Sequence, residues 1–100
     1  MKEINDSDVK SILKEKGEVL IKFGADWCNP CKVLNPILKE FSEKHSEIKV
    51  FSINVDENFE LASSYGVRNL PTVLYFNDGK ITDRKVGIAK VEDYEKLVLK

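Results

Sequence analysis

The sequence contains few cysteines and has no excess of either charge. Only two of its 100 residues are cysteine, which is too few for a protein scaffolded by several disulfides. Sixteen Lys and Arg residues nearly balance 17 Asp and Glu residues, so the formal net charge is -1. A general nucleic-acid binder needs a surplus of cations to displace counterions from phosphates, and the sequence therefore argues against that class of protein.

Long apolar runs are missing as well. No segment approaches the roughly 20 apolar residues that cross a bilayer, so we expect no membrane association. Residues 1–6 are charged and polar and lack the apolar stretch of a secretory signal. Taking Met1 as the native start, we expect a cytoplasmic location. The composition also excludes collagen, coiled coil and disorder.

The residues that are present suffice for one hydrophobic core. Hydrophobic residues make up 42% of the chain. A chain of this length buries about two-thirds of the surface that its unfolded form exposes, without help from metals or disulfides. No repeat, linker or low-complexity tract divides it. We therefore predict a single domain over residues 1–100, and nothing in the sequence suggests more than a monomer.

Hydrophobic spacing and turn residues predict short, alternating helices and strands. Strands are predicted at residues 19–23, 49–55, 72–76 and 81–86, with a short first strand at 2–4, and helices around 9–13, 34–41, 59–65 and 91–98. Alternation of strands and helices calls for parallel strands with crossover helices. Asp78-Gly79 is a hairpin signal and adds an antiparallel pair. The predicted class is α/β, with one mixed sheet between helices.

The two cysteines, Cys28 and Cys31, lie between the second predicted strand and the long helix. The first amides of a helix have no intrahelical partner and the helix dipole is positive there, so a sulfur is stabilised as thiolate. We expect Cys28, before the first turn, to be the nucleophile. Cys31, within the turn and less exposed, would be the resolving thiol. Pro30 has the fixed φ that suits a first helical turn and should hold the sulfurs close.

Other roles for the cysteine pair are weaker. Zinc takes about four ligands, and distant His45 is the only other soft or borderline ligand in the sequence. Haem attachment needs a histidine after the second cysteine, where Lys32 stands. A structural disulfide across so short a loop would add little stability, because it lowers the entropy of the unfolded chain only slightly. Two inert cysteines are the simplest alternative. Motif and placement together favour redox chemistry without a metal.

Around this pair, the sequence resembles the thioredoxin family. The matching residues run through most of the chain in the family's order: Phe23, Ala25, Trp27-Cys28-Asn29-Pro30-Cys31-Lys32, Pro36, Asn54-Val55-Asp56, Tyr65-Gly66-Val67-Arg68, Leu70-Pro71-Thr72, Asp78-Gly79 and Gly87. The resemblance implies a thioredoxin fold, a five-stranded mixed sheet between four helices. It also implies a protein disulfide reductase that binds no cofactor itself and receives electrons from NADPH through a flavin-containing thioredoxin reductase.

The resemblance further implies a surface that binds disulfide-containing protein substrates. Trp27 would flank the nucleophile, although a partly buried aromatic is the simpler role. Pro71 would follow a cis peptide bond and face the cysteine pair. Leu70 would offer its backbone N–H and C=O to an extended substrate segment.

The same surface would be completed by Val86, Gly87 and Ile88. The resemblance implies that these residues form an apolar patch around Cys28. For Val86 and Ile88, packing in the core or against the hairpin is an equally good explanation.

Four positions depart from the family pattern. Lys22 stands where the family commonly has Asp, Ser52 where it often has Lys, Gly24 where a large aromatic is common, and Asn29 where Gly is usual. A buried Lys22 ammonium must lose its proton, find a partner or reach water. Strand alternation puts Lys22 and Gly24 on one face, which leaves room for the lysine to reach solvent. Asp56, at the end of the next predicted strand, is a candidate partner.

Three interpretations of Lys22 stay open. It could simply occupy a solvated gap. A charged Lys22 would favour thiolates and make the cysteine pair more oxidising. A neutral Lys22 would act as a base for Cys31. We group Lys22 with Asn29, Pro30 and Asp56 as residues expected to tune the redox pair.

The leading functional interpretation is a thiol-disulfide oxidoreductase that reduces exposed disulfides of cytosolic proteins. The changes at Lys22, Gly24 and Asn29 also allow a specialised reductase for one dedicated partner. A third interpretation is a docking subunit that works without redox chemistry.

Overall fold

The computed structural model describes residues 1–98. Its elements follow in chain order: β1 (Lys2–Glu3), α1 (Asp6–Lys14), β2 (Glu18–Gly24), α2 (Asn29–Lys44), β3 (Lys49–Asn54), α3 (Phe59–Ser64), β4 (Thr72–Asn77), β5 (Lys80–Val86) and α4 (Val91–Val98). Each predicted helix and strand is present. Residues 99–100 of the predicted domain lie outside the described residues.

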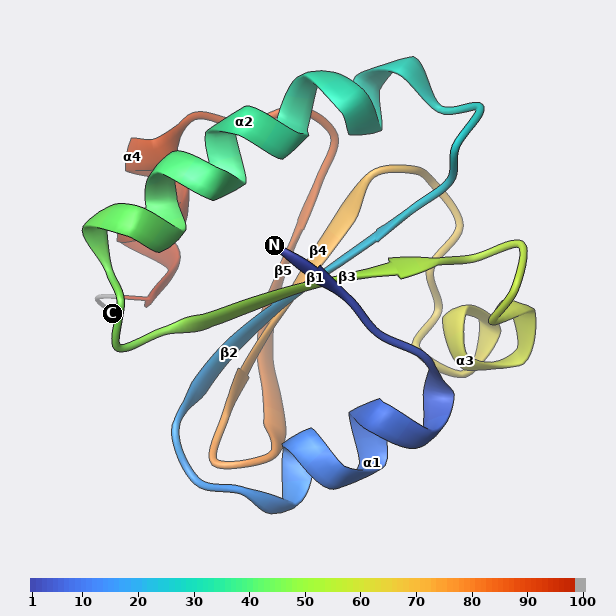
Figure 1. The fold of residues 1–100 in the computed structure, drawn as a ribbon, viewed down its shortest axis with the longest axis horizontal. Helices are drawn as coiled ribbons and strands as arrows, with labels where there is room; N and C mark the ends of the chain where they lie inside the picture. Colours follow the sequence, from blue (N-terminus) through green and yellow to red (C-terminus); the bar gives the residue numbers. More distant parts are fainter. Residues whose placement is uncertain (99–100) are drawn as a thin grey trace.

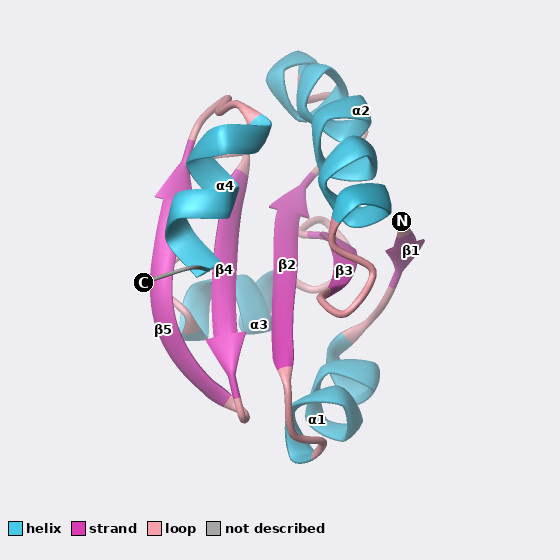
Figure 2. Cartoon of the chain, turned by 90° about the vertical axis from the view of Figure 1, so that its left-hand side faces the viewer, coloured by secondary structure: helices cyan, strands magenta, loops and turns pink. Residues whose placement is uncertain are grey.

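The strands form one five-stranded mixed sheet in the order β1-β3-β2-β4-β5. Strands β1 and β2 both pair parallel with β3, whereas β4 runs antiparallel to its two neighbours, β2 and β5. Helices α2 and α4 cover one face of the sheet, and α1 and α3 cover the other (Figures 1 and 2). The predicted α/β class, with its parallel crossovers and antiparallel hairpin, is confirmed.

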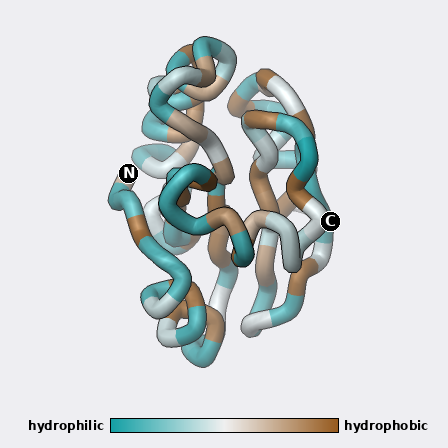
Figure 3. The backbone as a smooth tube through the Cα atoms, turned by 90° about the vertical axis from the view of Figure 1, so that its right-hand side faces the viewer, coloured by the Kyte–Doolittle hydropathy of each residue, from teal (hydrophilic) through white to brown (hydrophobic). Residues whose placement is uncertain are grey.

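The alternation of side chains along β2 divides the core into two layers. Leu20 packs with residues of α2 and α4, whereas Ile21 and Phe23 pack with residues of α1 and α3. Figure 3 shows the hydrophobic colour following the inner strands. By the same alternation, Lys22 and Gly24 face α2. A lysine therefore lies on the buried side of a central strand.

The turn between β4 and β5 is the hairpin that Asp78-Gly79 predicts. Both residues have positive φ, 52° and 82°, as a two-residue hairpin turn of this type requires. The Asp78 carboxylate accepts a 2.8 Å hydrogen bond from the backbone N–H of Gly17. A Cβ on Gly79 would stand 2.4 Å from the carbonyl oxygen of Leu13, so glycine is required there. The turn is thereby fixed against the end of α1.

The buried hydroxyl of Tyr94 provides a test of core energetics. Its oxygen has no hydrogen-bond partner among residues 1–98, and burial raises the pKa of Tyr94. An unsatisfied buried hydroxyl costs free energy that phenylalanine would not, so Tyr94→Phe should raise the free energy of unfolding by about 1 kcal/mol. Urea denaturation measures the change.

Tyr75→Phe is the matched control for Tyr94→Phe. The Tyr75 hydroxyl donates a 2.5 Å hydrogen bond to the Glu18 carboxylate, and burial with this contact raises the pKa of Tyr75 to about 12. The same removal of one oxygen should therefore lower the free energy of unfolding by about 1 kcal/mol. Equal effects of the two substitutions would contradict the explanation by hydrogen bonding.

Candidate active site

Cys28 is the N-cap of α2. Its backbone is extended, with φ -89° and ψ 104°, and its Sγ accepts a 3.2 Å hydrogen bond from the backbone N–H of Cys31. Pro30 lies in the first turn, where backbone amides have no partner within the helix, so its missing N–H costs no hydrogen bond. The prediction that an amide of the first turn of the helix points at the Cys28 sulfur is confirmed.

Cys28 and Cys31 are joined by a disulfide, with their Cα atoms 5.3 Å apart. The predicted closeness of the sulfurs is therefore confirmed. Both residues are buried in this oxidised state, with exposed fractions of 4% and 2%. Cys31 is the less exposed of the two, as expected, but only slightly. The larger difference is that the two cysteines line different cavities.

Cys28 lines a mostly apolar groove of about 650 Å³. The other lining residues are Trp27, Asn29, Pro30, Val55, Phe59, Ala62, Ser63, Val67, Arg68, Asn69 and Leu70. Trp27 and Phe59 are large aromatics with exposed fractions of 67% and 75%. Because apolar surface of this kind favours contact with another molecule, the groove can receive a polypeptide segment beside the Cys28 sulfur.

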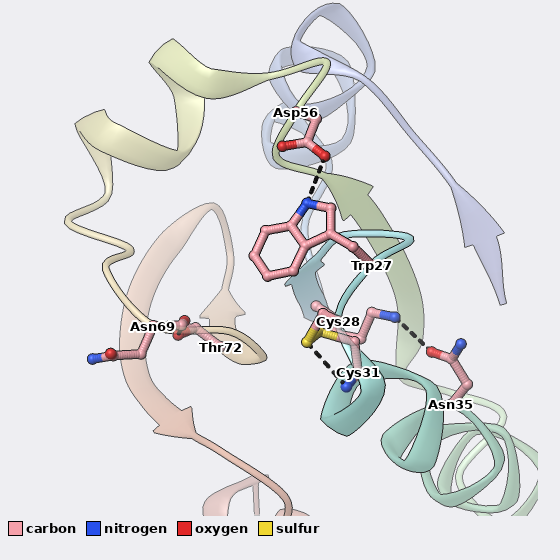
Figure 4. Close-up of a disulfide and its surroundings, with 8 residues drawn as sticks. Trp27, Cys28, Cys31, Asn35, Asp56, Asn69 and Thr72 are labelled. Carbon is pink, nitrogen blue, oxygen red and sulfur yellow. Dashed lines mark hydrogen bonds between the residues drawn. A yellow bond between two sulfur atoms is a disulfide. The ribbon is translucent and has the colours of Figure 1, made fainter.

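The Trp27 indole is held by Asp56. Its Nε1 donates a 2.9 Å hydrogen bond to the Asp56 carboxylate (Figure 4). Trp27 thus flanks the nucleophile as an exposed aromatic, and the alternative of a partly buried aromatic is wrong. Asp56 does not pair with Lys22, which hydrogen-bonds to Asn35 of α2 instead. The candidate pairing fails because Asp56 lies beyond the end of β3, beside the loop that carries Trp27.

Pro71 follows a cis peptide bond to Leu70, as the resemblance implies. The segment between Asn69 and Thr72 lies across from the disulfide in Figure 4, and Asn69 and Leu70 line the groove with Cys28. This segment therefore forms the opposite wall of the groove. That the Leu70 backbone binds substrate stays a prediction.

Gly87 is joined to this wall, since its backbone N–H donates a 2.8 Å hydrogen bond to the Pro71 carbonyl. Its neighbours Val86 and Ile88 have exposed fractions of 51% and 52%, so neither is a core residue. Val86 pairs with Thr72 in the β4–β5 ladder. None of the three lines the groove that contains Cys28. Their role in binding substrate stays a prediction.

Cys31 lines a second cavity of about 450 Å³, together with Lys22, Gly24 and Asn35. Lys22 has an exposed fraction of 7%, and its Nζ donates a 2.5 Å hydrogen bond to Oδ1 of Asn35. Burial lowers the pKa of Lys22, and the negative charge of Glu3 partly opposes this shift. A buried lysine must lose its proton, find a partner or reach water, and the structure shows that Lys22 has a partner in Asn35.

Asn35 and Phe59 are site residues that the sequence did not reveal. Asn35 lies one helical turn after Cys31, so its polar side chain among apolar neighbours was a usable signal. Phe59 fits the apolar pattern of a short helix, and that pattern carries no information on its exposure. Asn29 lines the groove beside Cys28, and its effect on the redox pair stays a prediction.

Residues 1–98 contain no group of three or more His, Cys, Asp or Glu side chains that could hold a metal ion. Within the same residues, no helix combines the length and apolar character needed to cross a membrane.

A disulfide at the start of a helix, open to a groove that can take a polypeptide, defines a thiol-disulfide oxidoreductase. The particular family follows from comparison: the family model Thioredoxin matches residues 1–100, and the chain belongs to the thioredoxin family. It is therefore a protein-disulfide oxidoreductase that acts by dithiol-disulfide exchange through Cys28 and Cys31.

Individual relatives agree with this assignment. The chain is 45% identical over 80 residues to a thioredoxin of Rickettsia bellii, covering 79% of this chain and 76% of the relative. It is 33% identical over 94 residues to a thioredoxin of Mycoplasmoides gallisepticum, covering 94% of each. Among solved structures, a single-substitution mutant of the Halobacterium salinarum thioredoxin superimposes with a TM-score of 0.90 at 34% identity, covering 97% of this chain and 86% of the other. The predicted thioredoxin fold is thus confirmed.

Proposed function

We propose that the protein reduces exposed disulfides of other proteins and is returned to its dithiol form by a flavin-containing, NADPH-dependent thioredoxin reductase. One observation carries the proposal: Cys28 lines the apolar groove, whereas Cys31 lines the separate second cavity. The sulfur that must meet a substrate is therefore the one beside the surface that can bind it.

The reaction follows from this arrangement. The Cys28 thiolate attacks one sulfur of the substrate disulfide, forms a mixed disulfide and releases the other substrate sulfur as a thiolate. Cys31 then attacks the Cys28 sulfur, which breaks the mixed disulfide and releases the second substrate thiolate. Two electrons have passed to the substrate, and the Cys28–Cys31 disulfide seen in the structure is the product state.

Substrate binding in this proposal uses the two walls of the groove. Trp27, held by Asp56, provides an exposed aromatic surface on one side. On the other side Leu70 would pair its backbone groups with an extended substrate segment, next to Pro71. The exposed Val86 and Ile88 with Gly87 would extend this apolar surface beyond the groove.

We further propose that the protein works as a monomer in the cytosol. Protein thiols are kept reduced there, and a dithiol that receives its electrons from NADPH contributes to that reduced state. Its near-balanced charge gives no reason to expect nucleic acid among its partners.

The proposal is tested by a coupled assay in which NADPH oxidation is followed with candidate thioredoxin reductases and insulin as the disulfide substrate. NADPH consumption should require the reductase, this protein and insulin together, and Cys28→Ser should abolish it. Reduction of insulin by chemically reduced protein, without NADPH consumption for any reductase, would reject the electron source but not the disulfide chemistry.

A further inference from the structure

Two separate cavities flank the disulfide, one for each cysteine. Among residues 1–98, no residue that lines the groove at Cys28 also lines the second cavity at Cys31. A protein substrate that fills the groove during the reaction therefore leaves the Cys31 side open. Any proton that the resolving thiol loses at that stage can leave through the second cavity.

Lys22 is a basic residue that lines the second cavity together with Cys31. A Cβ placed on Gly24 would stand 3.1 Å from Sγ of Cys31 and 3.2 Å from Cε of Lys22. The sulfur and the carbon that carries the lysine amine are thus at most 6.3 Å apart, the sum of those two distances. This separation allows proton transfer after a small side-chain movement or through one bridging water.

The surroundings of the Lys22 amine favour its neutral form. Its hydrogen-bond partner is the uncharged amide oxygen of Asn35, and burial lowers the pKa of the amine. The other titratable groups facing the cavity are the Met1 amino group and Glu3 on the β1 side, Asp26 after β2, and Lys32 with Cys31 on α2. Strand β3 contributes Ser52, Ile53 and Asn54, which do not titrate.

We propose that Lys22 accepts the proton of the Cys31 thiol when the mixed disulfide is resolved. The S–H bond of Cys31 breaks and its proton joins the neutral amine, which becomes an ammonium. The Cys31 thiolate then attacks Sγ of Cys28 and forms the Cys28–Cys31 bond. The bond between Cys28 and the substrate breaks, its electron pair stays on the substrate sulfur, and that thiolate takes a proton from solvent.

The cycle is completed when the Lys22 ammonium gives its proton to solvent at the cavity, where its partner Asn35 is exposed. This role deepens the proposed disulfide-reductase function and rests on it. It also explains why a lysine occupies the buried face of a central strand without a carboxylate partner among residues 1–98.

Lys22→Met tests the proposal in a single-turnover experiment. Reduced protein is mixed with a small disulfide substrate, quenched at successive times with acid and an alkylating reagent, and analysed by intact mass. The variant should form the mixed disulfide at the wild-type rate but resolve it about 10²-fold more slowly at pH 7, because it has lost a general base.

The pH profile separates proton transfer from a structural effect. Resolution by the Lys22→Met protein should accelerate about tenfold per pH unit between pH 6 and 8, because it then depends on spontaneous ionisation of a thiol with a reference pKa of about 8.5. Wild-type resolution should instead follow the ionisation of the Lys22 amine, whose pKa burial lowers, so its pH profile should differ from that of the variant. A variant that is merely distorted would be slower at every pH with an unchanged profile, and that result would overturn the proposal.

Two further variants serve as controls. Lys22→Arg keeps the positive charge but cannot lose its proton, so it should be as slow as Lys22→Met; restored resolution would show that charge alone matters and reject the proton transfer. Lys39→Ala removes an exposed lysine of α2 that lines neither cavity and should resolve at the wild-type rate. If the reduced wild-type protein formed neither a mixed disulfide nor the Cys28–Cys31 disulfide, the proposed function itself would be wrong, an outcome distinct from equal rates in the two proteins.

Discussion

A Cys31→Ser variant should form a mixed disulfide with a protein substrate and then stop. Its Cys28 keeps its place as N-cap, so the first attack should proceed. A serine hydroxyl cannot close a disulfide, and the sequence contains no third cysteine to replace Cys31. We expect turnover in the insulin assay to fall by about three orders of magnitude or more. Intact-mass analysis under non-reducing conditions should detect the one-to-one covalent complex.

Cys28→Ser is the matched control for this trap. Its remaining sulfur belongs to the residue that lines the second cavity, away from the groove. The control should therefore yield almost no covalent complex with a folded protein substrate. Equal trapping by the two single variants would show that either sulfur can reach the substrate. The assignment of Cys28 as nucleophile and Cys31 as resolving thiol would then be wrong.

The fold was largely predictable because local signals agree with the tertiary arrangement. Asp78 and Gly79 mark the hairpin through their positive φ values, and the alternation of Leu20 and Ile21 places adjacent side chains in different core layers. The order of the strands across the sheet was not predictable from hydrophobic patterns. Strand β1 is two exposed residues long, and its pairing with β3 is a long-range contact that no local pattern encodes.

The site was predictable where its chemistry depends on neighbours in the sequence. Cys28 lies directly before a helix, and its contact with the Cys31 amide follows from that position alone. The partner of Lys22 was not predictable, because the sequence does not show whether Asp56 or Asn35 packs against this part of β2. Only the packing of α2 over β2 selects Asn35, and it leaves Asp56 to bind Trp27.

Gly24 links this packing to the sequence. It occupies the end of a buried strand, where glycine usually weakens a structure relative to alanine by about 0.5–1 kcal/mol. Here an added Cβ would lie within 3.1 Å of Cys31 Sγ and 3.2 Å of Lys22 Cε, tighter than ordinary contacts. Overpacking of this kind costs about 1–3 kcal/mol. The overpacking cost exceeds the gain, so the absent side chain is what lets Lys22 lie beside Cys31.

Gly24→Ala should therefore lower the free energy of unfolding by about 1–2 kcal/mol, measured by urea denaturation of the oxidised protein. Part of the loss should disappear when Lys22→Ala is combined with it, because truncating the lysine removes one of the three crowded contacts. We expect a coupling energy of at least about 0.5 kcal/mol in this double-mutant cycle. Lys39→Ala, an exposed lysine of α2, is the matched control and should be additive with Gly24→Ala. A stabilising Gly24→Ala, or strict additivity with Lys22→Ala, would mean that the glycine is not there to accommodate the lysine.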